Sequence, residues 1–249
     1  MAEDITSDWV RLGDGPDAYI AAPRGRAPRG AIVTGAEMFG LTGHARGVCE
    51  RLARAGYVTV APDFYWRESR LAELGYDDAG RAEGRRLMQG LTRDGVLADV
   101  VAARDAALQR APGGGTAIVG LSVAGHIAVL AATRIPFGVA VTFYGGWTLD
   151  GGIPLAEPDP PLARAESIAA KGTFVLGFVG ADDFLISPDE WRRIDERLSA
   201  AGVAHELVSY PRVAHGFANG ERPDTYSEFA SADAWQRVLA VLGQRLARA

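Results

Sequence analysis

Cysteine is almost absent from this chain of 249 residues, in which Cys49 is the only one. A single thiol cannot form an internal disulfide, which fits a reducing compartment. The first four residues include two acids and lack the apolar stretch of a secretory signal peptide. From these absences we expect a cytoplasmic protein.

Long apolar runs, runs of basic residues and metal-ligand spacings are missing as well. No uninterrupted apolar run reaches the roughly 18 residues of a membrane span. The net charge is −5 with acids and bases interspersed, so neither nucleic acid nor an anionic membrane is indicated as a partner. No His-x-x-x-His or Cys-x-x-Cys spacing occurs, and the triple glycine 113–115 lacks the Lys-Ser/Thr of a phosphate-binding loop. We therefore expect neither a metal nor an organic cofactor.

Hydrophobic residues make up 48% of the chain and charged residues 23%, as in ordinary globular proteins. The length suits one large α/β domain or two small ones. Because no internal repeat and no long linker divides the sequence, we predict one domain over residues 1–249.

Predicted strands alternate with predicted helices along most of the chain. Apolar strands are expected at 31–34, 57–61, 117–119, 137–144, 173–179 and 205–210, and helices at 44–55, 94–110, 127–132, 188–201 and 225–247. This alternation predicts the α/β class, with a mostly parallel sheet covered by helices on both faces. Two leading strands, 7–12 and 17–22, suggest an antiparallel edge. The remaining segments, 64–93 with short helices and 145–167 as a Pro-rich loop, are possible covers of a site.

The stretch from Gly120 to Gly125 lies between an apolar strand and an apolar helix. A serine on a sharp strand-to-helix turn, flanked by small residues, is the pattern of a nucleophile elbow. Ser122 would be the nucleophile, while Ala124 stands where glycine is usual. In a chain with 31 glycines, this motif alone is weak evidence.

A serine nucleophile needs a base and a carboxylate that orients the base. His215 follows the last predicted strand, whereas the other three histidines suit packing, capping or surface roles: His44, His126 and His205. Asp182 and Asp183 both follow the strand 173–179, at the edge of the sheet where ligand sites form. The chain order Ser, Asp, His is that of the α/β-hydrolases.

Several sequence blocks resemble the dienelactone hydrolase family of α/β-hydrolases. They are Glu37-Met38-Phe39-Gly40, the elbow, Gly180-Ala181-Asp182-Asp183-Phe184 and His215-Gly216-Phe217. The resemblance extends from about residue 18 to 246 and implies the α/β-hydrolase fold. In the family the triad acid follows a Gly-x pair, which favours Asp182 over Asp183. The resemblance also implies that the backbone amides of Met38 and Val123 form the oxyanion hole.

The chain departs from the best-known family members, which use cysteine as nucleophile. With Ser122 in that place, the role of Glu37 is open. Family members also hold a substrate carboxylate with arginines. Asn219 occupies one expected arginine position, and Arg222 lies three residues further on. The other arginine should lie in the 64–93 segment, where Arg81, Arg85 and Arg86 are candidates.

These observations predict a serine hydrolase that cleaves an ester or lactone bond of a small molecule through an acyl-enzyme. The predicted catalytic residues are Ser122, Asp182 and His215, with Glu37, Phe39, Arg81 and Asn219 in their neighbourhood. A non-catalytic ligand-binding protein on the same fold, or a hydrolase of another acyl bond such as an amide, are the alternatives. We expect a monomer or a homodimer.

Overall fold

The computed structural model describes residues 4–246. Strands and helices alternate as follows: β1 (Ile5–Arg11), β2 (Asp17–Pro23), β3 (Gly30–Gly35), α1 (Gly43–Arg54), β4 (Val58–Pro62), α2 (Asp78–Gln89), α3 (Arg93–Arg110), β5 (Gly115–Leu121), α4 (Val123–Arg134), β6 (Val139–Phe143), the 3₁₀ helices η1 (Pro154–Ala156) and η2 (Pro161–Arg164), α5 (Ala165–Ala170), β7 (Phe174–Gly180), α6 (Pro188–Ala200), β8 (His205–Tyr210) and α7 (Glu228–Arg245).

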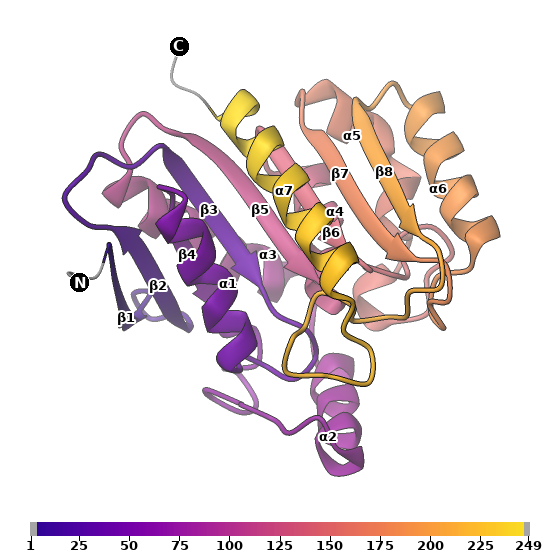
Figure 1. The fold of residues 1–249 in the computed structure, drawn as a ribbon, viewed down its shortest axis with the longest axis horizontal. Helices are drawn as coiled ribbons and strands as arrows, with labels where there is room; N and C mark the ends of the chain where they lie inside the picture. The colour runs from indigo at the N-terminus through magenta and orange to yellow at the C-terminus, as the bar shows by residue number, and fades with distance from the viewer. Residues whose placement is uncertain (1–3, 247–249) are drawn as a thin grey trace.

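One sheet of eight strands, in the order β1-β2-β4-β3-β5-β6-β7-β8, runs through the molecule (Figure 1). Strands β1 and β2 pair antiparallel, and β2 pairs antiparallel with β4. Every further neighbour pair is parallel. The predicted antiparallel edge and the mostly parallel sheet are thus confirmed.

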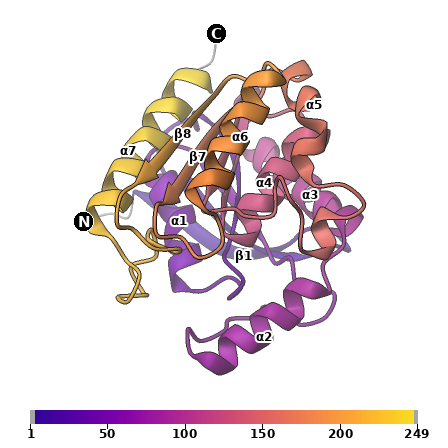
Figure 2. The same cartoon turned by 90° about the vertical axis from the view of Figure 1, so that its right-hand side faces the viewer.

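Helices cover both faces of the sheet, as Figures 1 and 2 show. On one face α1 and α7 pack against strand residues such as Ile32, Val119 and Val141. On the other face α3, α4 and α6 pack against Val33, Ile118 and their neighbours. Because both faces are buried, the central strands are apolar at nearly every position, which explains why their apolar runs were readable in the sequence.

The segment 64–93 differs from the prediction of several short helices. It contains a single helix of 12 residues, α2, which stands out from the rest of the molecule (Figure 2). Asp77 caps its first turn by accepting a hydrogen bond from the Gly80 amide. Leu87 and Met88 are its only buried residues with large side chains, so the sequence carries little apolar periodicity there.

The segment 145–167, predicted as a loop, includes the short helices η1 and η2. Several element boundaries also differ from the prediction by a few residues, for example in α4, which runs from Val123 to Arg134 rather than over 127–132. The closing helix begins at Glu228 rather than at 225, because the Ser227 side chain accepts a hydrogen bond from the Ala230 amide and caps it. The predicted end of that helix, Ala247, lies outside the described residues. No helix within residues 4–246 has the length and apolarity needed to cross a membrane.

Strands β3 and β5 approach the start of α4 so closely that side chains must be small. A Cβ on Gly120 would lie 1.9 Å from the Ala124 carbonyl oxygen, and one on Gly35 would lie 2.4 Å from the Ala124 Cβ. Ala124, which replaces the usual glycine of the motif, is therefore accommodated because Gly35 faces it without a side chain.

This contact gives a stability prediction. We expect Gly35→Ala to lower the free energy of unfolding by about 1–3 kcal/mol through overpacking. The double variant Gly35→Ala/Ala124→Gly should recover most of that loss in urea denaturation. Gly47→Ala in α1, where nothing lies within 4 Å of an added Cβ, is the control and should not lose stability. A double variant no more stable than Gly35→Ala would show that Ala124 is not the obstacle.

Candidate active site

Ser122 occupies the turn between β5 and α4 in a conformation that non-glycine residues rarely adopt. Its φ is 53° and its ψ is −116°, a strained geometry that persists only where the surroundings enforce it. Its amide donates to the Phe143 carbonyl at 2.9 Å, and its carbonyl accepts from the His126 amide at 3.2 Å. Ser122 is the N-cap of α4, yet its side chain makes no capping bond, so the hydroxyl is available elsewhere.

That hydroxyl meets His215, which lies in the loop after β8. The Ser122 Oγ and His215 Nε2 atoms are 3.1 Å apart, across 93 residues of sequence. The imidazole is 6% exposed, and its edge contacts the ring of Tyr144 with centroids 4.9 Å apart. The predicted pairing of Ser122 with His215 is therefore present in the structure.

The carboxylate that meets His215 belongs to Asp183, which corrects the prediction of Asp182. His215 Nδ1 lies 2.9 Å from Asp183 Oδ2 and 3.1 Å from Oδ1. Asp183 is buried, whereas the side chain of Asp182 is exposed to solvent.

Backbone hydrogen bonds after β7 decide which acid points inward. The Asp183 amide donates to the Gly180 carbonyl at 3.1 Å, which closes a tight turn, and the Asp182 amide donates to the Val213 carbonyl at 3.0 Å. Asp183 Oδ1 then accepts from the amides of Leu185 and Ile186. The turn therefore directs Asp183 toward the histidine loop and Asp182 toward water.

Glu37 is a buried carboxylate with a complete set of partners. Its Oε1 accepts from the Tyr144 hydroxyl at 2.9 Å, and its Oε2 accepts from Asn219 Nδ2 at 3.0 Å. Burial and the Glu37 charge raise the pKa of Tyr144 well above its usual value, so this phenol remains a donor at neutral pH. Arg222 Nη1 lies 4.0 Å from Glu37 Oε2.

Met38 follows Glu37 in a loop that is tied to the segment after β4. The Met38 carbonyl accepts from the Tyr65 hydroxyl at 3.1 Å, and the Phe39 carbonyl accepts from the Leu74 amide at 2.9 Å. Within the described residues neither the Met38 amide nor the Val123 amide donates a backbone hydrogen bond. Both amides are therefore free to donate to a ligand, as the predicted oxyanion hole requires.

A cavity of about 190 Å³ opens beside Ser122 and His215. Of the predicted neighbours, Glu37, Phe39 and Arg81 line it, whereas Asn219 contributes through its bond to Glu37. The remaining lining residues are Met38, Arg85, Met88, Trp147, Phe184, Leu185 and Arg222. Met88, Trp147, Phe184 and Leu185 were not predicted as site residues, although Phe184 stands in a block that carries the family resemblance. Met88 lies in α2, and the other three lie in loops without periodicity that follow β6 and β7.

Three arginines give the cavity a cationic wall. Arg81 lies near the exposed acids Asp78 and Asp224, at 3.5 and 3.9 Å, and Arg85 forms no ion pair within the described residues. Arg222 is 8% exposed, and its Nε is buried without a hydrogen-bond partner in that part of the chain. Arg86, the third candidate from α2, points elsewhere and pairs with Glu68 and Glu83.

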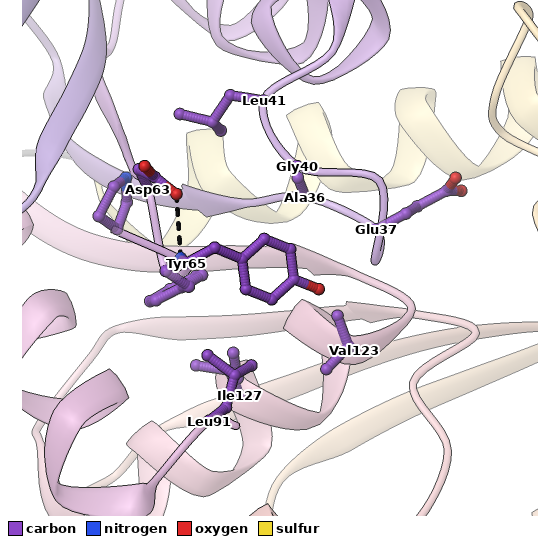
Figure 3. Close-up of a pocket in the computed structure, with 11 residues that line it drawn as sticks. Ala36, Glu37, Gly40, Leu41, Asp63, Tyr65, Leu91, Val123 and Ile127 are labelled. Carbon is purple, nitrogen blue, oxygen red and sulfur yellow. Dashed lines mark hydrogen bonds between the residues drawn. The ribbon is translucent and has the colours of Figure 1, made fainter. Parts of the chain in front are cut away.

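A smaller cavity of about 20 Å³ lies behind the Met38 loop, where Figure 3 shows Tyr65, Leu91 and Ile127 around it. Ser122 does not line it, and the Glu37 side chain points away from it in Figure 3. This volume holds about one water molecule, so it cannot take a substrate. Among residues 4–246 no group of three His, Cys, Asp or Glu side chains could hold a metal ion.

The fold and the order of Ser122, Asp183 and His215 define the α/β-hydrolase class. The chain belongs to the dienelactone hydrolase family, whose profile matches residues 17–246. Relatives 31% and 33% identical that are described as carboxymethylenebutenolidases place it among the carboxylic ester hydrolases.

Two relatives are each described as "Putative carboxymethylenebutenolidase". The protein from Synechocystis is 31% identical over 225 residues, covering 88% of this chain and 88% of its own. The protein from Salmonella typhimurium is 33% identical over 241 residues, covering 93% of this chain and 84% of its own. A crystal structure from Klebsiella pneumoniae, described as a "Putative Dienelactone Hydrolase", superposes with a TM-score of 0.83 at 29% identity and covers 96% of this chain and 99% of that chain.

His126, in the first turns of α4, supports the site without lining the cavity. It is fully buried, and its Nδ1 lies 3.1 Å from the Gly146 carbonyl. Burial lowers the pKa of His126 to about 4. The ring is therefore neutral at pH 7 and donates Nδ1–H to the loop that follows β6.

The lowered pKa of His126 predicts a pH-dependent stability. Since the folded-state pKa lies below the ordinary value of 6.5, the unfolded chain binds more protons between pH 6.5 and pH 4, and stability falls as the pH falls through that window. Between pH 7 and pH 4.5 the wild type should lose roughly 2–3 kcal/mol more than His126→Asn, whose amide can still donate to Gly146 but does not titrate. Urea unfolding at both pH values measures this difference, and equal losses would contradict the assignment.

Proposed function

We propose that this enzyme hydrolyses a small-molecule ester or lactone with Ser122 as nucleophile. The observation that carries the proposal is the continuous chain from Ser122 Oγ to His215 Nε2 and from His215 Nδ1 to Asp183. With Nδ1–H donated to Asp183, Nε2 is the unprotonated nitrogen that faces the hydroxyl. This is the tautomer that a general base requires.

In the proposed reaction, Nε2 of His215 accepts the Ser122 proton as Oγ attacks the carbonyl carbon. The carbonyl oxygen becomes an oxyanion that the Met38 and Val123 amides stabilise. The imidazolium, stabilised by Asp183, then protonates the leaving oxygen and an acyl-enzyme forms. Water repeats the sequence on the acyl-enzyme, releases the acid and regenerates the Ser122 hydroxyl.

Glu37 has no place in activating the nucleophile in this proposal. A nearby carboxylate can help to ionise a thiol of pKa about 8.5, but an alkanol remains protonated at neutral pH and depends on a base during attack. Both Glu37 oxygens already accept hydrogen bonds, from Tyr144 and Asn219. We propose that Glu37 fixes the start of the Met38 loop and neutralises part of the Arg222 charge.

We propose further that the substrate carries a carboxylate. Arg81, Arg85 and Arg222 line the same cavity as Ser122, while Glu37 is the only acid that lines it. A guanidinium binds a carboxylate strongly through charge-assisted hydrogen bonds.

The two neighbouring aspartates allow a matched test of the triad. Asp183→Asn should lower kcat by up to about 10⁴-fold, because the imidazole loses the carboxylate that fixes its tautomer. Asp182→Asn, an identical change at an exposed position, should stay within about threefold of wild type. Ser122→Ala should abolish turnover, and an organophosphonate should label Ser122 in the wild type. Labelling at another residue, or a reversal of the two aspartate results, would contradict the proposed triad.

The arginine wall predicts a dependence on substrate charge. Arg85→Gln should lower kcat/KM about tenfold for an ester that carries a free carboxylate, which corresponds to about 1.4 kcal/mol. For the neutral amide analogue of the same ester the change should be less than twofold. Arg86→Gln, one position along α2 and paired with Glu68 and Glu83, is the control. Equal losses on both substrates would argue against carboxylate recognition.

A further inference from the structure

Phe184 is the most exposed large hydrophobic residue of the described chain. It is 84% exposed, compared with 76% for Phe229 and 47% or less for the other exposed large hydrophobics. Unlike Phe229, it lines the cavity beside Ser122. Its ring centroid lies 5.0 Å from that of His215, with the planes tilted by 54°. An apolar ring in water is thus placed directly against the imidazole of the site.

The backbone that carries this ring is fixed on both sides. Asp183, which precedes Phe184, pairs with His215. The amides of Leu185 and Ile186, which follow Phe184, donate to Asp183 Oδ1 at 2.8 and 3.2 Å. Ile186 is 1% exposed. Leu185 fills the space that a side chain on Gly146 would occupy, since a Cβ there would lie 2.7 Å from Leu185. The turn therefore presents the Phe184 ring without burying it.

The surroundings of Phe184 indicate what could cover it. Trp147, Leu185 and Met88 line the same cavity, so the ring is one of several apolar side chains in its wall. Removing apolar surface from water stabilises a complex by about 25 cal/mol per Å², and aromatic rings favour stacked or edge contacts with a second ring. A flat apolar group of a ligand fits these side chains best.

The position of Phe184 next to His215 identifies which part of the substrate carries the flat apolar group. In acyl transfer the leaving oxygen receives its proton from the histidine, while the acyl carbon faces the serine and the oxyanion donors. A group that rests against the histidine ring is therefore the group attached to the leaving oxygen.

We infer that Phe184 is a specificity-determining residue that binds a flat, aryl or conjugated group on the leaving-oxygen side of the substrate. This inference rests on the proposed hydrolysis at Ser122. The arginines are proposed to bind the carboxylate of the substrate, and Phe184 would bind its other end. The ring contacts a group that does not itself react, so it binds the substrate and the transition state about equally. The contact should therefore lower KM more than it raises kcat.

The test uses acetate esters of ethanol, 2-phenylethanol and 2-(1-naphthyl)ethanol, whose leaving oxygens have similar basicity but different aryl area. Phe184→Ala should raise KM about five- to tenfold for the two aryl esters, with kcat within twofold. For ethyl acetate kcat/KM should change less than twofold. Phe229→Ala removes another largely exposed phenyl ring, from the first turn of α7, and should alter none of these values. Phe184→Trp should retain the preference for aryl esters.

The outcomes separate this inference from the proposed function. If wild type hydrolyses all three esters and Phe184→Ala has no effect on their ratio, the inference is wrong and hydrolysis at Ser122 stands. If kcat falls equally on every ester in Phe184→Ala, the ring acts by positioning Asp183 and His215, and the specificity role is also wrong. If wild type hydrolyses none of the esters and Ser122 resists labelling, both proposals are overturned.

Discussion

The left-handed turn at Ser122 is the constraint on which the site depends. It requires β5 and α4 to meet almost backbone to backbone, as the absence of a side chain at Gly120 permits. A non-glycine residue at positive φ is strained by about 1–3 kcal/mol, and bonds to Phe143 and His126 retain it. In this turn the Ser122 hydroxyl does not cap α4. The Val123 amide makes no backbone hydrogen bond within the described residues, and it lies at the start of α4, where the helix dipole favours negative charge. The proposed nucleophile and the proposed oxyanion donor thus follow from one backbone conformation.

Local pattern was sufficient to predict the sheet, the elbow and His215, because buried parallel strands are apolar throughout and loop residues follow them directly. Local pattern could not choose between Asp182 and Asp183. Adjacent residues in a turn differ only in direction, and that direction is set by a bond to Val213 from another loop. The bounds of α2 within the segment 64–93 could not be predicted for a related reason, since its buried face relies on glycines that approach other backbone. Gly84, for example, would place a Cβ 2.8 Å from the Met38 carbonyl.

Glu37 illustrates how a buried acid can hold two loops in place. Its carboxylate lies beside a cation, Arg222, and accepts from the Tyr144 phenol and the Asn219 amide. A buried carboxylate is tolerated only when it is paired and hydrogen-bonded, so this network is a structural requirement whatever the nucleophile. Asn219 in turn accepts from the Glu221 amide within the same loop, and its bond to Glu37 ties the loop after His215 to the loop before α1. The same carboxylate therefore connects the two loops that flank the serine.

The proposed reacting groups and the cavity walls come from different parts of the fold. Ser122 follows β5 directly, and Asp183 and His215 lie in the loops after β7 and β8, so the sheet places all three at one edge. Arg81 and Arg85 come from α2, which stands apart from the sheet (Figure 1), and Trp147 comes from the loop after β6. Substitutions in those walls can change which ester is bound without disturbing the strained turn. Phe184 is the exception, because it adjoins Asp183 in sequence, and only the separate effects on KM and kcat distinguish lost selectivity from a displaced acid.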